Sequence, residues 1–564
     1  MTSRPFDDAL VMRELSRRKL LIGGGAGLLA GAFALRQALR PRTQVPVQAS
    51  GGSEPRRGGR LKVAFDGAAI TTFNFDPHNS GFAPHNRVMR SLYDNLTYLR
   101  ADQSVAPWLA ESWEISPDRT EYTFKLRAGV KFHDGSPLDA EALKANFERV
   151  GGKGSVLYSR SCLGPFEGAE VVAPDRVRVK LAEPFTPLLR NLSMTKLSLV
   201  SPSAVAKHGK HYSINPVGTG PFKFVSMRQG SEIRLVRNAD YAWAPENAAH
   251  AGPPLLDELT FLNVPEEGTR VAVLQSGQAD TADIIPPQFI PSLRADPRFA
   301  LLEQELLDTN YAISINVTRA PWDDEVMRLA LRLSLDIDTI VRVIYQGNIR
   351  RAWSLLSPSM LGTGEAALAN SWQPDPKRAA ELLTSRGWIA KKSGGLRERD
   401  GKTLTLRLVD SQGNREKRLD VMHLARAQLA ASGIGLVIDT QPAGMYADKL
   451  NKNDYDITAS AGFHADPDIL RQSYDPTARV ALTGMRVDDP ELTALVREAA
   501  RTDGDDARAA LYLKAQRHAI DKTYQIPIYV LRYNVASARH VHGVRLDAHG
   551  FPEFRDAWLD VARS

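Results

Sequence analysis

The chain has 564 residues, of which 43% are hydrophobic and 24% are charged, a balance typical of folded globular proteins. Its length predicts two or more domains. The formal net charge is +7, but residues 1–49 hold eight Lys or Arg against three Asp or Glu. Most of the basic excess therefore lies in the N-terminal segment, which argues against a nucleic-acid partner. The single cysteine, Cys162, excludes an internal disulfide and a multi-cysteine metal site.

The N-terminal segment has the pattern of an export signal. Arg17 and Arg18 precede residues 20–35, which carry no charge and form a run that is short and weakly hydrophobic for a membrane span. Paired arginines before such a run are typical of the twin-arginine signal, which a receptor reads. We expect export by the twin-arginine translocase, with cleavage near residues 47–49. Three further arginines precede that site, so an uncleaved leader that anchors the chain in the membrane is the alternative.

Residues 50–60 are rich in Gly, Ser, Pro and Arg and are typical of a linker. Beyond it, residues 121–127 and 176–181 alternate between apolar and polar side chains, which predicts two half-buried strands. Between these strands, Asp139 can cap a helix. The apolar face of that helix would carry Leu143, Phe147 and Val150.

A second group of elements follows residue 370. Asp375 can cap a helix, Pro376 fits its first turn, and Gly387 can end it. Next comes an apolar alternation at Leu404, Leu406 and Leu408, then an amphipathic helix with Leu419, Met422, Ala425 and Leu429, then a strand over residues 436–440. This order is a βαβ unit, which implies a parallel pair and a right-handed crossover. The predicted class is α/β with mixed sheets.

Six segments, in order, resemble the family 5 extracytoplasmic solute-binding proteins, the peptide and nickel binders of ABC importers. They are SLYDNL at 91–96, PWLAESW at 107–113, YTFKLRAGVKFHDG at 122–135, GTGPF at 218–222, LQSGQAD at 274–280, and Asn316-Val317 with residues 330–336. Their order and spacing match the family from residue 60 to the end. The turn at Asp134-Gly135 and the loop at 218–221 also have a purely structural explanation as tight reversals.

The resemblance implies a two-lobed periplasmic binding protein fold of the cluster C type, with mixed sheets and a hinge between the lobes. We expect a first lobe over residues 61–310 with a subdomain near 83–209, a second lobe over 311–524, and a return to the first lobe over 525–564. Closure around the hinge would trap the ligand, and the ligand would stabilise the closed state. We therefore expect a periplasmic monomer that captures a short peptide or similar small solute and delivers it to the permease of an ABC importer.

The resemblance also implies that an acidic residue within 455–468 pairs with the α-amino group of a peptide ligand. Asp466 and Asp468 both fit, with Phe463 and His464 beside them, and the sequence does not choose between the two carboxylates. A buried carboxylate that faces an ammonium forms a charge-assisted hydrogen bond. In the alternative, Asp466 only shapes the turn before Pro467 and caps the following helix.

Two further loops complete the expected site. Ser411 and Gln412 follow a strand end, where ligands of α/β sheets often bind. Dipeptide-binding relatives carry an arginine in this loop for the ligand carboxylate, whereas here Arg415 is only nearby, which argues against a dipeptide. Asn79, Ser80 and Gly81 match the first ligand loop of the family, with a surface turn as the alternative.

Other functions were weighed against this one. A nickel or metal complex, or an opine, is the alternative ligand on the same fold, because His540 and His542 share one face of a strand and His464 lies in the binding stretch. We nevertheless assign no metal ligand and no cofactor. An exported hydrolase is less favoured, because the chain has no G-x-S-x-G elbow and no H-E-x-x-H, and we expect His133 and Asp134 to be scaffold. A tethered chaperone or sensor is the third alternative, and a neighbouring importer gene would argue against it.

Overall fold

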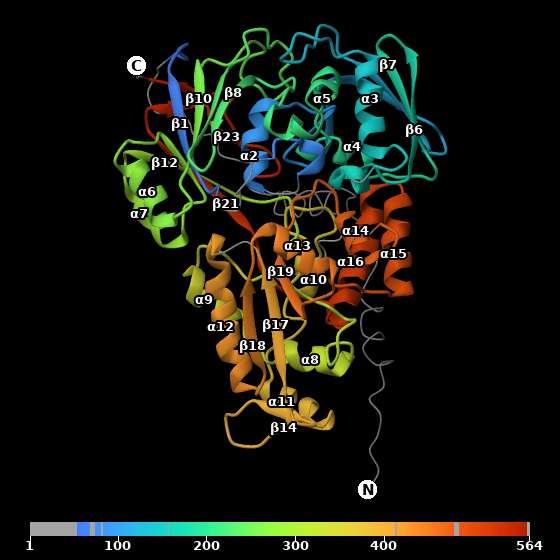
Figure 1. Ribbon diagram of the computed structural model, residues 1–564, viewed down its shortest axis with the longest axis vertical. Coiled ribbons are helices and arrows are strands. Elements are labelled where there is room, and N and C mark those ends of the chain that lie inside the picture. Colours follow the sequence, from blue (N-terminus) through green and yellow to red (C-terminus); the bar gives the residue numbers. More distant parts are fainter. Residues whose placement is uncertain are drawn as a thin grey trace, which may run out of the picture. The chain divides into compact units, whose positions relative to one another are not determined.

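The computed structural model describes residues 54–67, 74–80, 83–155, 157–411, 414–478 and 484–560 (Figure 1). The predicted export signal with Arg17 and Arg18, and the predicted site residues Gly81 and Gln412, lie outside the described residues. A seven-stranded sheet is the centre of what we call the first lobe, and a five-stranded sheet is the centre of the second lobe. Among the residues described, none of the helices has the length and apolar character needed to cross a bilayer.

The seven-stranded sheet has apolar cores on both of its faces. Its strands, in spatial order, are β12 (Phe299–Glu305), β21 (Arg532–Ala538), β11 (Thr281–Asp283), β1 (Arg60–Phe65), β10 (Glu258–Asn263), β9 (Glu232–Arg237) and β8 (Phe222–Arg228). In β1, which runs parallel to both neighbours, Leu61, Val63 and Phe65 enter one core. Ala64 enters the other core, together with residues of α6 (Glu267–Gln275) and α7 (Ile290–Ala295). Helix α2 (Ala83–Leu92) contributes Val88 and Leu92 to the first core.

A four-stranded antiparallel sheet forms a subdomain of the first lobe. Its order is β4 (Ala110–Ile115), β5 (Glu121–Leu126), β7 (Arg176–Leu181) and β6 (Phe166–Ala173). The predicted strands β5 and β7 are confirmed, and α3 (Ala140–Gly151) begins where Asp139 accepts a hydrogen bond from the Ala142 backbone N–H at 2.9 Å. Phe147 of α3 stacks on Phe124 of β5 with ring centroids 6.0 Å apart, so the helix covers this sheet as its apolar face predicts.

The five-stranded sheet contains the predicted βαβ unit. Its order is β18 (Gly435–Thr440), β17 (Thr405–Asp410), β19 (Ile457–Ser460), β13 (Tyr311–Ile315) and β20 (Gln525–Tyr529). β17 pairs in parallel with β18, and α12 (Arg418–Ala431) connects them, as predicted. The predicted capped helix is α11 (Pro376–Ser385), with the Asp375 carboxylate accepting from the Arg378 backbone N–H at 2.9 Å. The other second-lobe helices of eight or more residues are α8 (Glu325–Leu333), α9 (Ile337–Tyr345), α13 (Ala443–Asn451), α15 (Pro490–Arg501) and α16 (Asp505–Asp521).

The chain crosses between the two sheets twice. Residues 306–310 join β12 to β13, and residues 530–531 join β20 to β21. Because β12 pairs antiparallel with β21, and β13 pairs antiparallel with β20, the two crossings run side by side. We expected the return to the first lobe at residue 525, but it comes after β20. Residues 525–529 stay in the second lobe because Ile526 and Ile528 are buried there beside β13.

The predicted sharp loop at residues 218–221 packs against the end of α2. A Cβ atom on Gly220 would lie 2.4 Å from the carbonyl carbon of Leu92, and one on Gly218 would lie 2.2 Å from the Leu92 carbonyl oxygen. Both contacts are with backbone that cannot move aside locally. Glycine is therefore required here for close approach of two chain segments.

Candidate functional site between the two lobes

The loop that follows β17 has an unusual backbone. Glu416 (φ 55°, ψ 28°) and Lys417 (φ 62°, ψ 26°) both lie in the left-handed region, although neither is glycine. Such residues store strain, persist only where their surroundings hold them, and cluster at functional sites. Here the strained turn leaves Arg415 and Glu416 buried at the carboxyl end of a parallel strand.

Three arginine–carboxylate pairs gather around this loop. Arg415 Nε lies 3.1 Å from Asp66 Oδ2 at the end of β1, so this pair joins the two lobes. Arg418 Nη2 lies 2.8 Å from Glu416 Oε2 within the second lobe, and Arg87 Nε lies 3.0 Å from Asp283 Oδ2 within the first lobe. All six side chains are buried. We call them the inter-lobe charge cluster: Asp66, Arg87, Asp283, Arg415, Glu416 and Arg418.

Aromatic rings surround the second-lobe side of the cluster. Tyr529 stacks on Tyr311 with centroids 4.8 Å apart and packs at 4.9 Å against Tyr345. The Arg418 guanidinium lies 5.0 Å from the centre of the Tyr311 ring, and the Tyr345 hydroxyl donates to the Glu416 carbonyl at 2.7 Å. Burial alone would raise the pKa of Glu416, but the charges of Arg418 and Arg415 lower it below the ordinary value. Glu416 is therefore held as a carboxylate in a largely apolar surrounding.

Several polar atoms of the cluster have no hydrogen-bond partner in the described part of the chain. They are Arg87 Nη1 and Nη2, Asp283 Oδ1 and Oδ2, Arg415 Nη2 and Glu416 Oε1, and all of them are buried. A buried donor or acceptor without a partner carries a desolvation cost, and such groups in native proteins usually meet water, an ion or a ligand. The cluster thus offers both donors and an acceptor to a polar molecule between the lobes.

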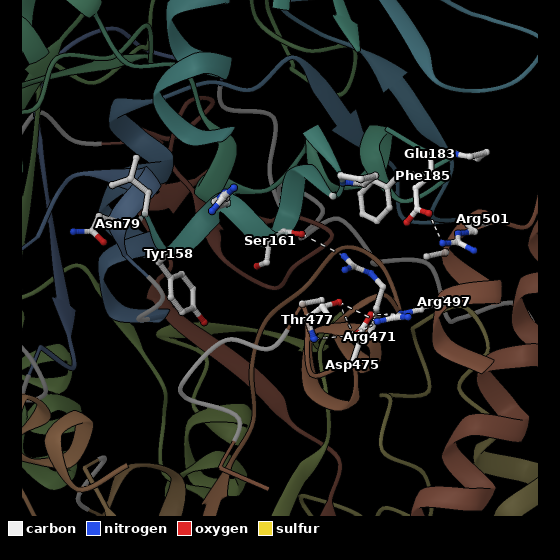
Figure 2. A pocket seen from close by; sticks show the side chains of 17 residues that line it. Asn79, Tyr158, Ser161, Glu183, Phe185, Arg471, Asp475, Thr477, Arg497 and Arg501 are labelled. Carbon is white, nitrogen blue, oxygen red and sulfur yellow. Dashed lines mark hydrogen bonds and ion pairs between the residues drawn. The ribbon is translucent and has the colours of Figure 1, made fainter. Parts of the chain in front are cut away.

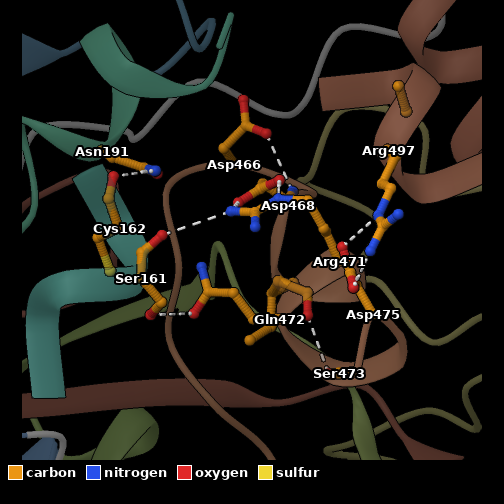
Figure 3. Close-up of polar contacts among 12 residues, drawn as sticks. Ser161, Cys162, Asn191, Asp466, Asp468, Arg471, Gln472, Ser473, Asp475 and Arg497 are labelled. Atoms are coloured by element: carbon orange, nitrogen blue, oxygen red, sulfur yellow. Dashed lines mark hydrogen bonds and ion pairs between the residues drawn. The ribbon is translucent and has the colours of Figure 1, made fainter. Parts of the chain in front are cut away.

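The two carboxylates expected to bind a ligand ammonium are both paired with arginines. Figure 3 shows one of these pairs, between Asp468 and Arg471. Arg508 holds Asp466 through Nη2 to Oδ1 at 2.6 Å and Nη1 to Oδ2 at 3.0 Å. Arg190 of the first lobe also approaches Asp466 Oδ2, at 3.7 Å. Asp468 accepts from Arg471 Nε and Nη2, both at 2.7 Å.

The local turn also uses Asp466. Its Oδ1 accepts from the Asp468 backbone N–H at 3.0 Å, and α14 (Ile469–Tyr474) begins directly afterwards. Asp466 therefore shapes the turn before the helix, as the structural alternative stated. Its carboxylate does not cap α14 in the usual way, because the residue at the cap position is Asp468, which makes no side-chain capping bond.

Phe463 and His464 meet a residue that the sequence analysis missed. Lys196, from the first lobe, donates from Nζ to the Phe463 carbonyl at 3.1 Å, and its Nζ lies 3.4 Å from His464 Nε2. All three residues are buried. The sequence signal was present, since Lys196 lies in the short segment TKLSLV, where the flanking residues are apolar or small.

The remaining described residues of the predicted site lie in two loops. Asn79 and Ser80 are in the first lobe, and Ser411 is in the loop that follows β17. Ser80 is buried with its hydroxyl 2.5 Å from His85 Nδ1, and the Asn79 carbonyl accepts from Asn74 Nδ2 at 3.0 Å. Ser411 is partly buried directly after β17. Of the described residues predicted from sequence, Asn79 lines the cavity described below, and Phe463, His464 and Asp466 lie close to residues of the first lobe. The arginine and lysine partners of this stretch were not predicted.

A cavity of about 780 Å³ is lined by both lobes (Figure 2). The first lobe contributes Asn79, Tyr158, Ser161, Glu183 and Phe185 among others, and the second lobe contributes Arg471, Asp475, Thr477, Arg497 and Arg501. Two ion pairs border it: Arg497 Nε to Asp475 Oδ2 at 2.7 Å, and Arg501 to Glu183 across the lobes. Of the site residues predicted from sequence, Asn79 lines this cavity.

The candidate metal and catalytic residues have separate partners. His540 Nε2 lies 3.0 Å from Asp280 Oδ1, and His542 Nε2 lies 2.8 Å from Asp560 Oδ2. No group of three or more His, Cys, Asp or Glu side chains arranged for a metal ion occurs among the residues that the structure describes. His133 Nε2 lies 3.0 Å from the Gly220 carbonyl, while Asp134 accepts from three serines, so both stabilise loops.

The chain forms two lobes, each built on its own sheet, and two neighbouring chain crossings connect them. A polar region and a cavity lie between the lobes. This arrangement defines a two-lobed solute-binding protein of the periplasmic type. The family model for bacterial extracellular solute-binding proteins, family 5 Middle, matches residues 104–477, and the chain belongs to this family. The resemblance seen in the sequence is thereby confirmed.

Individual relatives agree with this assignment. The glutathione-binding protein GsiB of Salmonella typhimurium is 29% identical over 506 residues, which cover 87% of this chain and 92% of that protein. The oligopeptide-binding protein AppA from Bacillus subtilis, solved with a nonapeptide, has a TM-score of 0.80 at 21% identity, covering 90% of this chain and 100% of that one. NikZ from Campylobacter jejuni, solved with Ni(L-His), has a TM-score of 0.73 at 22% identity, covering 87% and 97%.

These comparisons confirm the fold class and the general function. The chain has the two-lobed α/β fold of periplasmic binding proteins. It is the substrate-binding component of an ABC importer for peptides or small solutes, and it belongs with substrate-binding proteins rather than with an enzyme family.

Proposed function

We propose that the chain captures a short peptide between its two lobes and presents it, in the closed state, to the importer permease. The observation that carries this proposal is the inter-lobe charge cluster. It combines buried guanidinium groups of Arg87 and Arg415 with a buried carboxylate oxygen of Glu416, and their atoms Arg87 Nη1 and Nη2, Arg415 Nη2 and Glu416 Oε1 have no hydrogen-bond partner among the described residues. A short peptide has a carboxylate and an ammonium, which match these two kinds of group.

The relatives support a ligand of this size and chemistry. GsiB is named for glutathione, which is a tripeptide, and AppA was solved with a nonapeptide. The cavity of about 780 Å³ lies within the range of small-molecule sites and has room for several residues. Metal complexes and opines are the competing ligands, and the experiment below distinguishes them.

The contacts of the site residues are part of the proposal. We assign ligand contacts to Asn79, Ser80 and Gly81 in the first lobe, and to Ser411, Gln412, Phe463 and His464 in the second. A ligand ammonium would reach Asp466 or Asp468 only by replacing Arg508 or Arg471, because both carboxylates are paired in this structure. We therefore place the first contact of the ligand ammonium at Glu416 in the inter-lobe charge cluster.

The cellular setting is also proposed. The paired arginines Arg17 and Arg18 support export by the twin-arginine translocase to the periplasm, either as a cleaved protein or as one anchored by its leader. Within this proposal the chain acts as a monomer without catalysis. The two candidate catalytic residues, His133 and Asp134, are engaged with loop backbone and serines.

Native mass spectrometry tests the ligand class. The protein, purified from its own host without the leader, is measured intact, and bound molecules are then released by denaturation. Release of short peptides is the expected result, and their lengths would define the capacity of the site. Release of one non-peptide species or of a nickel complex would overturn the peptide assignment and leave the importer role intact. If the protein is empty, a thermal-shift screen with defined peptide pools replaces the release step.

A further inference from the structure

Lys196 is a buried cation that makes no ion pair with a carboxylate of the described residues. It lies in a short 3-10 turn (Thr195–Leu197) of the first lobe, and 1% of the residue is exposed. Throughout the described chain, no carboxylate oxygen lies within 4.0 Å of its ammonium. The Phe463 carbonyl at 3.1 Å and His464 Nε2 at 3.4 Å are its polar contacts. A buried charge that lacks a counter-charge is strongly disfavoured, so this ammonium calls for an anion.

The surroundings of Lys196 only partly compensate its charge. The ammonium lies 4.4 Å from the ring centre of Phe463 and 5.2 Å from that of Tyr158, which are favourable cation–π distances. Asp308 interacts with Lys196 electrostatically, but burial raises the pKa of this carboxyl well above its ordinary value. Asp308 is therefore a weak counter-charge.

Two buried histidines interact with the ammonium electrostatically. His549 is 2% exposed, and neither of its ring nitrogens has a hydrogen-bond partner among the described residues. Burial, followed by the charges of Arg90 and Lys196, lowers the pKa of His549 well below its ordinary value. The pKa of His464 is lowered in the same way by burial, then by Lys196 and His549. Both rings are therefore neutral at neutral pH, and His549 has a free N–H to donate.

The ammonium and the inter-lobe cavity share a wall. Tyr158, whose ring lies over Lys196, also lines the cavity of about 780 Å³ (Figure 2). The cavity is lined by four arginines, of which Arg471, Arg497 and Arg501 are paired with carboxylates. Arg160 makes no ion pair among the described residues and leaves the lining with one positive charge in excess.

We propose that Lys196 forms a subsite for a carboxylate group of the ligand, so that the solute is one that carries a free carboxylate. This inference rests on the proposed capture of a ligand between the lobes. Lys196 belongs to the first lobe, and Phe463 and His464 belong to the second, so the subsite forms where the lobes meet. A carboxylate bound there neutralises the ammonium in the closed arrangement and favours closure.

The first test compares two probes with the full mature chain. A pool of random tripeptides with free carboxylates and the same pool with amidated C-termini are titrated, and the thermal shift gives apparent dissociation constants. Wild type is expected to bind the free-acid pool about thirtyfold more tightly, the scale of losing one side of a buried charge pair. Lys196→Met should lose this preference, and Lys207→Met, at an exposed first-lobe lysine, should keep it. Equal binding of both pools by wild type, or an unchanged preference in Lys196→Met, overturns the subsite.

A second test needs no peptide. Melting temperatures of wild type and Lys196→Met are measured at pH 7.5 in sodium acetate and in sodium chloride of equal ionic strength. Acetate should stabilise wild type but not the variant, and equal responses overturn the subsite. If acetate stabilises wild type but not the variant, and neither tripeptide pool binds, the result supports the subsite and counts against a peptide as the ligand. If Lys196→Met does not fold, the two comparisons made with wild type still test the subsite: free-acid against amidated tripeptides, and acetate against chloride.

Discussion

The buried pair between Asp466 and Arg508 leads to a prediction that separates a structural role from a ligand-binding role. The two side chains are 0% and 1% exposed, and they share two hydrogen bonds. Asp466→Asn removes the negative charge and leaves the Arg508 guanidinium buried without compensation. Breaking a buried pair in this way costs about 3–5 kcal/mol. We therefore expect Asp466→Asn to lower the free energy of unfolding by about that amount.

Urea unfolding of four proteins measures this: wild type, Asp466→Asn, Arg508→Met and the double variant. The double variant should be more stable than Asp466→Asn, because it no longer buries an unpaired charge. Asp505→Asn is the matched control. Asp505 pairs with Arg190, which also approaches Asp466, but Asp505 is largely exposed. An exposed pair contributes about 1 kcal/mol or less, so this control should remain close to wild type.

The opposite pattern would refute the reasoning. If Asp466→Asn unfolds like wild type while its affinity for an amine-bearing ligand falls by about 2 kcal/mol or more, the carboxylate serves the ligand. Arg508 would then be a partner that gives way to a ligand ammonium.

Three further predictions concern stability. Burial raises the pKa of Asp94 to about 6, so wild type loses stability as the pH rises through 6. Asp94→Asn lacks this loss, so its free energy of unfolding relative to wild type should rise by about 1 kcal/mol between pH 5 and pH 8. Burial lowers the pKa of His133 to about 4, so stability is lost as the pH falls from 6.5 towards 4. His133→Gln, which can still donate to the Gly220 carbonyl, should reduce that acid loss by about 2–3 kcal/mol. Gly220→Ala should destabilise by about 2 kcal/mol or more, because its Cβ meets Leu92 backbone, whereas Gly252→Ala, which meets nothing within 4 Å, should be tolerated.

Each of these has a contrary result. A constant stability difference between Asp94→Asn and wild type across the pH range would show that this carboxyl titrates normally. If His133→Gln loses as much stability at acidic pH as wild type does, a group other than His133 is responsible for that loss. Similar melting temperatures for the two glycine variants would mean that the loop at residues 218–221 can shift away from α2.

Much of the fold could be predicted because it depends on local periodicity. The alternations at residues 121–127 and 176–181, and the cap at Asp139, specify β5, β7 and α3 through burial of one face. The return to the first lobe was misplaced because Ile526 and Ile528 alternate like a strand of either sheet. Only long-range pairing with β13 assigns them to the second lobe.

The candidate site was harder to predict, since its chemistry depends on which distant charges meet. The stretch at residues 463–468 could be selected by resemblance, but nothing in its sequence shows that Arg508, 42 residues later, neutralises Asp466. Lys196 meets Phe463 from 267 residues away, and no periodic pattern encodes such a contact. Contacts between polar groups that lie far apart in the sequence therefore need the folded arrangement.

The position of β21 in its sheet sets the order in which the protein can be completed. β21 is an internal strand between β12 and β11, yet it is made from residues 532–538, near the end of the chain. During synthesis, the first-lobe sheet cannot be completed until this segment has left the ribosome. Until then, β11 and β12 each lack the neighbouring strand with which they pair in the folded protein. The first-lobe sheet is therefore completed only after the second lobe has been synthesised, and a chain that stops before residue 532 should be an early target for proteases.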